Sequence, residues 1–397
     1  MSSPSSSAEE PSSKAGMHRL PQNSLYTDAR DMSLVSFLIY VWAKVVHVLD
    51  EHEIPSSKEK RSWSPREVKE FIQTHQTKLA KAYPEQFKEG NKLTFQALDV
   101  LIQRSPNREL TMNIWDSDYE THELVYGVCK DSVNRRITVV FRGTESSSNA
   151  MKSNWNANLD VGKAPETLPT VLEGKLLSGR KKVWIHKGFH EFMNKPTEDP
   201  TDHVSRTKKQ QVIDSVKKMV KRYPDYKVYV TGHSLGAALA TLTSYYLATD
   251  VDSKTGKSII PTPVTCINFA SPRIGDGVFL EAVQVLERQG KLRICRFVNH
   301  KDLVCAFPTL NYKHVGFMVK MKSKPGKLAI TYPKPNEGWG SWLERAVGMS
   351  WPAAFNLKYD HSAGEYGRRV EIHRKQLEDK DLVRLYRGRQ KRKKGSA

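Results

Sequence analysis

Short runs of β-branched and apolar residues alternate with helical stretches from about residue 105 onward. Five runs are predicted as strands, namely Leu124–Cys129, Ile137–Phe141, Lys227–Thr231, Val264–Phe269 and Leu292–Val298. Helices with apolar positions at helical spacing lie between them, one starting near Thr207 and one running from Leu235 to Leu247. This alternation predicts an α/β fold with a mostly parallel central sheet and helices on both faces.

The flanking segments differ from this domain in composition. Residues 1–30 are rich in Ser and Pro and are predicted to be disordered. Residues 31–104 are predicted to be a helical extension, with one helix starting at Ser64 and Pro65. The α/β domain is expected over 105–380, with an irregular Trp- and Pro-rich insertion over 318–360. Residues 381–397 form a basic tail that is expected to be solvated and mobile.

One long apolar run, Leu34 to Leu49, lies within the extension. A membrane span requires about 20 apolar residues. This run is shorter and is interrupted by Lys44 and His47. The pattern therefore favours a buried helix, an amphipathic helix or a membrane-associating anchor over a transmembrane span.

Charge and cysteine content narrow the class of protein. The 397 residues include 63 Lys and Arg against 43 Asp and Glu, which gives a net charge of +20. This charge favours an anionic partner, either nucleic acid or an acidic lipid surface. The four cysteines are too few and scattered for a disulfide framework, and the first residues lack a signal-peptide pattern. An intracellular, cytoplasmic protein that is not secreted is expected.

The segment Gly232-His233-Ser234-Leu235-Gly236 has the G-x-S-x-G pattern. An apolar strand precedes it and a small-residue helix follows, which is the setting of a nucleophile elbow. Ser234 is then the candidate nucleophile, and the two glycines leave room for the tight turn. The backbone N–H of Leu235, at the start of the helix, is a candidate oxyanion donor.

A serine nucleophile needs a base that is oriented by an acid, and this architecture orders them Ser, Asp, His along the chain. Asp302 follows the strand ending at Val298, and His361 follows the insertion. The order Ser234, Asp302, His361 satisfies the rule. The rivals are less suitable: the histidines His233, His300, His314 and His373, and Asp276, which lies in a Gly-rich turn.

A second oxyanion donor is expected in the loop after an earlier strand. Ile137–Phe141 is followed by Arg142-Gly143-Thr144. Thr144 offers both a backbone N–H and a hydroxyl. We predict that Thr144 and Leu235 together form the oxyanion hole.

An ordered set of motifs runs over roughly residues 105–375: FRGT, NWNANLD, HKGF, GHSLGAALA, FASPRIGD, VNHKDLV, YKHVG and YDHSAGEY. This set resembles the class 3 (fungal-type) lipase family. The resemblance implies an α/β-hydrolase fold and hydrolysis of acylglycerol or phospholipid esters. It also implies Ser234 as nucleophile, Asp302 as acid, His361 as base, and Thr144 and Leu235 as the oxyanion hole. The stretch from Thr144 through Trp155 resembles the lid of fungal members.

Three features depart from that family's small secreted members. The first 104 residues have no counterpart there, the lid-like stretch is more polar, and the Trp-rich insertion before His361 is unusual. The substrate and the mode of activation are therefore not given by the resemblance.

The sequence predicts a serine lipase or esterase that hydrolyses carboxylic esters of lipids through an acyl-enzyme. No metal or cofactor is required. The expected partners are the lipid ester and an anionic membrane or lipid-droplet surface, and no nucleic acid is expected. The alternative is a non-catalytic lipase-like module that binds acyl ligands or a partner. The oligomeric state does not follow from the sequence.

Overall fold

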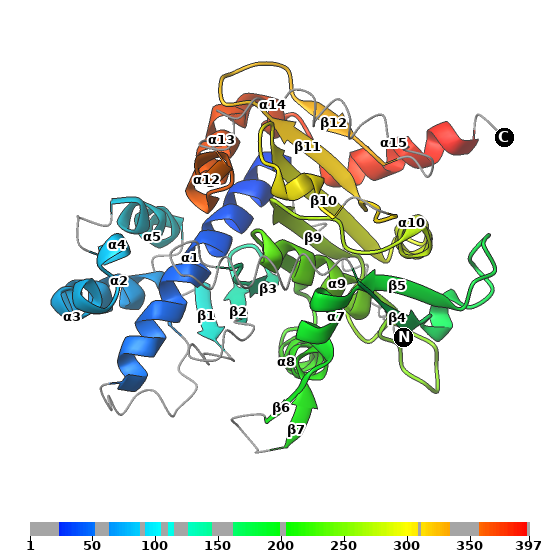
Figure 1. Ribbon diagram of the computed structural model, residues 1–397, viewed down its shortest axis with the longest axis horizontal. Coiled ribbons are helices and arrows are strands. Elements are labelled where there is room, and N and C mark those ends of the chain that lie inside the picture. The colour runs from blue at the N-terminus through cyan, green and yellow to red at the C-terminus, as the bar shows by residue number, and fades with distance from the viewer. Residues whose placement is uncertain are drawn as a thin grey trace, which may run out of the picture.

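The computed structural model describes residues 24–51, 63–87, 92–104, 110–114, 126–144, 162–198, 204–308, 311–333 and 357–394. An eight-stranded sheet in the order β1-β2-β3-β8-β9-β10-β11-β12 lies at its centre (Figure 1). These strands are β1 (Leu110–Ile114), β2 (Tyr126–Asp131), β3 (Arg136–Phe141), β8 (Lys227–Gly232), β9 (Val264–Phe269), β10 (Leu292–Asn299), β11 (Phe317–Met321) and β12 (Ala329–Thr331). The five from β3 to β11 run parallel, and antiparallel pairs form both edges. The mostly parallel sheet predicted from the sequence is confirmed.

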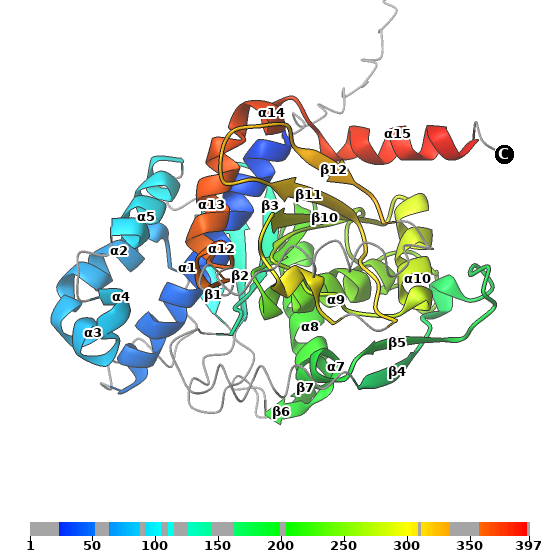
Figure 2. The ribbon, with the colours of Figure 1, turned by 45° about the horizontal axis from the view of Figure 1, so that its top comes forward.

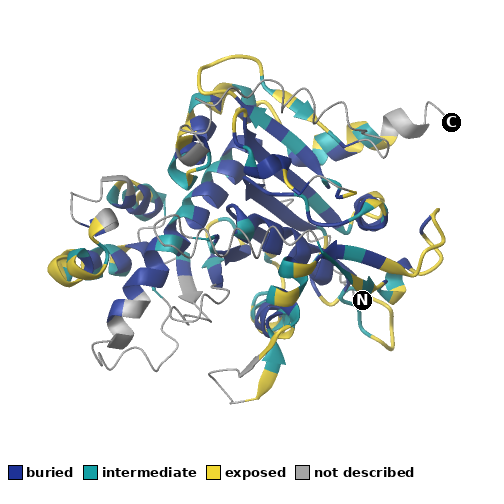
Figure 3. Ribbon diagram, in the orientation of Figure 1, coloured by how far each residue is buried: buried dark blue, intermediate teal, exposed yellow. Residues whose placement is uncertain are grey.

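Helices cover both faces of the sheet (Figures 1 and 2). One face packs on α8 (Lys208–Arg222), α9 (Leu235–Thr249) and α10 (Gly277–Arg288), and the other on α1 (Leu25–Glu51) and α13 (Ala363–Ile372). Side chains alternate between the layers, since Val228 and Val230 of β8 face α9 whereas Tyr229 faces α1. Because both faces are covered, the central strands are buried along almost their whole length and are rich in apolar residues (Figure 3). This three-layer arrangement, with its strand–turn–helix after β8, is the α/β-hydrolase fold.

Helix α1 begins at Leu25, so the prediction of a disordered segment up to residue 30 is wrong over residues 25–30, where Leu25, Tyr26 and Ala29 are buried in the core. One face of α1, with Ala29 and Ile39, packs on the sheet and on α13, and another face, with Leu38 and Trp42, packs on α2 (Pro65–Thr74) and α5 (Lys92–Arg104). The apolar run is therefore a core helix, buried on almost every side. Among the described residues, no helix has the length and apolarity needed to cross a bilayer.

The helices after α1 form a separate small layer. They are α2, α3 (Gln76–Ala82), α4 (Pro84–Phe87) and α5. Ser64 caps α2 by accepting a hydrogen bond from Glu67, and Pro65 is the first helical residue, as predicted. Their apolar side chains join those of α1 in one cluster, so this region is attached to the domain through α1.

Shorter elements complete the described chain. They are β4 (Lys163–Thr167) with β5 (Lys182–His186), β6 (Pro196–Glu198) with β7 (Ser205–Thr207), α7 (Lys187–Asn194), α12 (Leu357–Asp360) and α14 (Arg374–Glu378). Two 3-10 turns span Thr170–Leu172 and Val304–Ala306. None of these short strands joins the central sheet.

The predicted mobile basic tail is wrong over residues 382–394, which form helix α15 (Leu382–Lys394). Leu382, Leu385 and Tyr386 recur at helical spacing and pack against the sheet. The Tyr386 hydroxyl donates to the buried carboxylate of Glu287 at 2.6 Å. Basic residues outnumber these apolar positions, so the composition of the segment indicated a solvated tail.

The predicted irregular insertion is also wrong at both ends, because residues 318–321 belong to β11, residues 329–331 form β12 and residues 357–360 form α12. Its middle part, residues 334–356 with Trp339, Trp342 and Trp351, lies outside the described residues. The lid-like stretch 145–161 and the segment 1–23 lie outside them as well.

Candidate active site

Ser234 occupies a sharp turn between β8 and α9. Its backbone has φ 59° and ψ −126°, a region that non-glycine residues rarely adopt. The turn is held by a hydrogen bond from the Ser234 N–H to the Phe269 carbonyl at 3.0 Å. A Cβ on Gly232 would clash with the Gly236 carbonyl, and one on Gly236 would clash with the Phe141 carbonyl. Strain and close approach of this kind are typical of a nucleophile elbow.

Three side chains predicted from different parts of the sequence meet at this turn. The Ser234 Oγ lies 2.8 Å from the His361 Nε2. The other ring nitrogen of His361, Nδ1, lies 2.9 Å and 3.1 Å from the two carboxylate oxygens of Asp302. His361 stands in the turn between α12 and α13, and Asp302 stands in the loop after β10. The structure therefore joins a hydroxyl, an imidazole and a carboxylate in one hydrogen-bonded chain.

The carboxylate of Asp302 is buried and has further donors. The Tyr366 hydroxyl donates to Oδ2 at 2.6 Å, and the Val304 N–H donates to Oδ1 at 3.0 Å. Burial opposes ionisation, but the neighbouring His361 and the bond from Tyr366 outweigh it and hold the pKa of Asp302 below its ordinary value. An ionised Asp302 orients His361 with its Nε2 toward the serine.

The rival residues have other surroundings. His314 contacts the Cys305 carbonyl at 2.8 Å, His373 contacts the Lys322 carbonyl at 3.0 Å, and Asp276 caps α10. His300 lies in the turn after β10 and is exposed. His233 lies beside the serine and contacts the His361 backbone through its Nε2, not the Ser234 hydroxyl.

The two predicted oxyanion donors lie at the same edge of the sheet. Strands β3 and β8 are parallel neighbours in which Phe141 pairs with Gly232, so the loops that follow them start side by side. Leu235 is the first residue of α9, whose N–H groups carry partial positive charge. Thr144 is the last described residue of the loop after β3. Two donors at this edge can stabilise negative charge that develops next to Ser234.

This arrangement suits nucleophilic attack on an acyl group. Among the described residues, no group of three His, Cys, Asp or Glu side chains is placed to hold a metal ion. No disulfide joins the four cysteines, all of which are buried.

Sequence reasoning missed two tyrosines that contact these groups. Tyr366 lies five residues after His361, inside the YDHSAGEY motif, and its spacing from the histidine could have indicated it. Tyr40 lies on α1, and its hydroxyl is 3.1 Å from the His233 Nδ1. No local pattern links Tyr40 to a residue 193 positions away.

Part of the chain is similar to known lipases and phospholipases. Residues 138–312, from β3 to the loop before β11, match the family described as lipase (class 3). The phospholipase A1-IIgamma of Arabidopsis thaliana is 34% identical over 208 residues, which are 48% of this chain and 46% of that protein. The phospholipase A1-II 3 of Oryza sativa subsp. indica is 29% identical over 198 residues, or 48% and 43%. The chain thus spans less than half the length of these curated relatives.

Solved lipase structures resemble it at lower identity. The triacylglyceride lipase of Rhizomucor miehei has 20% identity and a TM-score of 0.47, covering 77% of this chain and 99% of that one. Lipase II from Rhizopus niveus has 20% identity and a TM-score of 0.45, covering 76% and 94%. The matched family region contains the elbow and the predicted acid, Asp302. Over residues 138–312, which are less than half of its length, the chain is therefore similar to the class 3 lipase family.

Proposed function

We propose that this protein is a serine hydrolase that cleaves carboxylic esters of lipids. The observation that carries the proposal is the hydrogen-bonded chain from Ser234 through His361 to Asp302 at a strained strand–helix turn. Its distances, between 2.8 and 3.1 Å, are those that proton transfer requires.

Acylation follows from this geometry. His361 accepts the Ser234 proton at Nε2 while Oγ attacks the ester carbonyl, and the buried carboxylate of Asp302 stabilises the imidazolium that forms. The N–H groups of Thr144 and Leu235 hold the oxyanion of the tetrahedral intermediate. His361 then returns the proton to the departing alcohol, and the acyl group stays on Ser234.

Deacylation uses the same groups, with water in place of the Ser234 hydroxyl as the nucleophile. A water molecule gives its proton to His361 and attacks the acyl carbonyl, and the oxyanion occupies the same hole. Collapse of the intermediate returns the proton to the Ser234 oxygen and releases the fatty acid.

The substrate class we propose is a glycerophospholipid at an anionic surface. The curated relatives are named phospholipases A1, which supports an acyl ester of a phospholipid. Basic side chains lie beside the acid loop, because Lys301 adjoins Asp302 and the His300 N–H pairs with the Met321 carbonyl, next to Lys322. Burial first, and then the charges of Lys320, Lys322 and Lys301, lower the pKa of His300. Positive potential at this edge would attract a phosphate headgroup.

Product analysis tests the proposal. Purified protein is incubated with labelled phosphatidylcholine, phosphatidylglycerol and triacylglycerol, and the released fatty acid and lysolipid are quantified. We expect fatty acid from the phospholipids and at least a 10³-fold lower rate for Ser234→Ala, in line with the loss of a triad nucleophile. Equal hydrolysis by Ser234→Ala would contradict the proposal.

Vesicle binding tests the anionic surface separately. Ser234→Ala protein is sedimented with two kinds of vesicle. One is phosphatidylcholine alone, and the other also contains about 30% phosphatidylglycerol, which makes its surface strongly negative. We expect binding only to the anionic vesicles and weakening as salt rises. Lys301→Glu with Lys322→Glu should abolish it, whereas equal binding to both vesicle types would contradict the anionic surface.

A further inference from the structure

We propose that Tyr40 of α1 is a positioning residue for this site. It connects the turn before Thr144 to the backbone that carries His361, by way of the His233 ring. The inference rests on the proposed function, and it assigns a role in the reaction to a helix that lies outside the matched family region, residues 138–312.

Three consecutive hydrogen bonds form this connection. The Gly143 N–H lies 3.1 Å from the Tyr40 hydroxyl oxygen. That oxygen lies 3.1 Å from the His233 Nδ1. The His233 Nε2 lies 2.6 Å from the backbone carbonyl oxygen of His361.

The chemistry of the end groups fixes the direction of every bond. A carbonyl oxygen only accepts, so the proton of His233 is on Nε2. Its Nδ1 therefore accepts from the Tyr40 hydroxyl, which in turn accepts from the Gly143 N–H. Burial, and next the neighbouring His361, lower the pKa of His233 to about 3, so the ring stays neutral at physiological pH.

Both ends of the connection bear on catalysis. Gly143 immediately precedes the proposed donor Thr144, and a Cβ at this position would clash with the Tyr40 oxygen. At the other end, the His361 carbonyl belongs to the residue whose imidazole contacts Ser234. The ring centroids of His233 and His361 are 4.8 Å apart, so His233 also supports the base by packing. Tyr40 thus couples the oxyanion turn to the base loop.

The test compares Tyr40→Phe with Tyr26→Phe. Tyr26 is a matched control on the same helix, because its hydroxyl donates to the Glu371 carboxylate at 2.9 Å, away from the triad. Initial rates are measured on p-nitrophenyl butyrate, a soluble ester, together with the melting temperature of each variant. We expect Tyr40→Phe to lower kcat by about 10- to 100-fold, the effect of misplacing catalytic groups by about 1 Å. The KM should stay within about twofold, since Tyr40 is not proposed to bind substrate.

A double-mutant cycle with His233→Gln separates positioning from general loss of stability. If the two residues act as one unit, the double variant loses little more activity than either single variant. Full kcat in Tyr40→Phe, an equal loss of kcat in Tyr26→Phe, or additive losses in the cycle would each overturn the inference. A wild-type protein without esterase activity would instead overturn the proposed function.

Discussion

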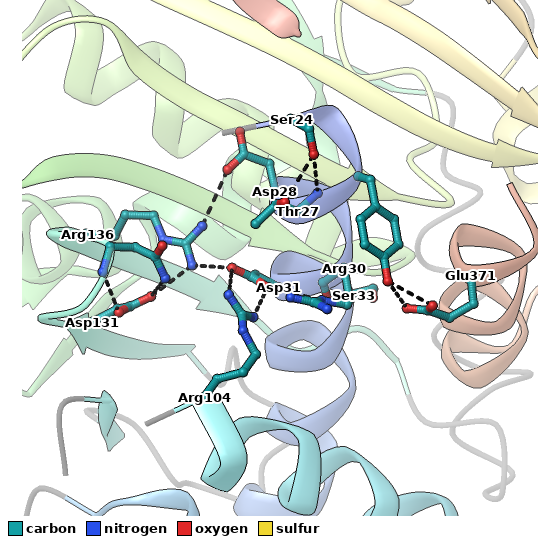
Figure 4. A network of polar contacts seen from close by, with 12 residues as sticks. Ser24, Thr27, Asp28, Arg30, Asp31, Ser33, Arg104, Asp131, Arg136 and Glu371 are labelled. Carbon is teal, nitrogen blue, oxygen red and sulfur yellow. Dashed lines mark hydrogen bonds and ion pairs between the residues drawn. The ribbon is translucent and has the colours of Figure 1, made fainter. Parts of the chain in front are cut away.

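The part of α1 from residue 25 to residue 40 lies along the sheet, and its two halves make different kinds of polar contact. In the first half, Asp28 and Asp31 meet the Arg136 guanidinium, which also contacts Asp131 at 2.9 Å (Figure 4). Arg104 of α5 adds a second cation to Asp31. Arg136 is almost fully buried. Its positive charge outweighs the burial that opposes ionisation and holds the pKa of Asp131 below its ordinary value.

The second half uses neutral groups. The Ser36 hydroxyl lies 2.9 Å from that of Thr231, which donates to the Ile267 carbonyl at 2.6 Å, so Ser36 is the donor. Tyr40 contacts His233 one helical turn later. Nine residues separate Asp31 from Tyr40, or about 13 Å along the helix.

This separation has a physical reason. A second buried carboxylate beside His361, in addition to Asp302, would further stabilise the imidazolium in the resting protein and reduce the fraction that is ready to accept a proton. The helix therefore has ionic anchoring away from the triad, and hydroxyl contacts next to it. We interpret the charged half as structural and the neutral half as part of the site.

The largest predicted effect comes from removing the cation that the carboxylates of the charged half share. Arg136→Met leaves three carboxylates buried without their shared cation and should lower the free energy of unfolding by about 3–5 kcal/mol. Urea denaturation measures it, with the exposed neighbour Arg135→Met as the control, expected within about 0.5 kcal/mol. Well below the melting temperature, kcat should be unchanged. A large kcat loss in folded Arg136→Met would contradict a purely structural role.

The second effect is a pH dependence that belongs to the neutral half. His233 has a folded pKa of about 3 against an ordinary value of 6.5, so its contribution is complete above pH 6.5 and is lost as the pH falls toward 3. Between pH 8 and pH 5 this loss should reach about 2 kcal/mol. The measurement is the difference in unfolding free energy between wild type and His233→Gln across that range.

Glu287 is a second buried group that titrates within this pH range, because burial raises its pKa to about 7. Its contribution has the opposite sign: it is complete below pH 4.5 and is lost as the pH rises through 7. Both proteins should therefore carry Glu287→Gln. Parallel curves for the two proteins would show that His233 does not titrate as predicted.

The third effect concerns the hydroxyl on the other side of the triad. Tyr366→Phe removes a 2.6 Å bond to Asp302 and should lower kcat about tenfold, or about 1.4 kcal/mol. Tyr386→Phe is the control, because its hydroxyl bonds Glu287 and not the triad. Steady-state rates on the soluble ester measure both. Equal kcat values for Tyr366→Phe and Tyr386→Phe would show that the Tyr366 hydroxyl does not contribute to catalysis.

The smallest effect sharpens the contrast within α1. Ser36→Ala removes one neutral donor and should cost about 1 kcal/mol of stability. Ser33→Ala is the control, since its hydroxyl bonds only the Arg30 carbonyl of the same helix and should matter less. Thermal denaturation compares the two. A Ser36 effect as large as that of Arg136 would erase the distinction between the halves.

The sequence was sufficient for features that depend on local order. The elbow around Ser234 follows from a strand, a turn and a helix in succession, and Asp302 and His361 follow from their order along the chain. These side chains meet because each stands in a loop that follows a strand or helix at one edge of the sheet.

Features that depend on tertiary packing could not be predicted in this way. The apolar pattern of α1 was equally consistent with a membrane anchor, and only its burial against β8 and β9 places Tyr40 at the elbow. The edge strand β12 has three residues and exposed positions, which leaves little pattern to detect. The basic residues of α15 outnumber the few apolar side chains that attach it to the sheet.

Covalent labelling tests the central claim most directly. Wild-type and Ser234→Ala proteins are treated with a fluorophosphonate, and the modified residue is identified by mass spectrometry of the intact protein and its peptides. The account predicts a single adduct on Ser234 in the wild type, slower labelling in His361→Ala and none in Ser234→Ala. An unlabelled wild type, or an adduct that persists in Ser234→Ala, would contradict it.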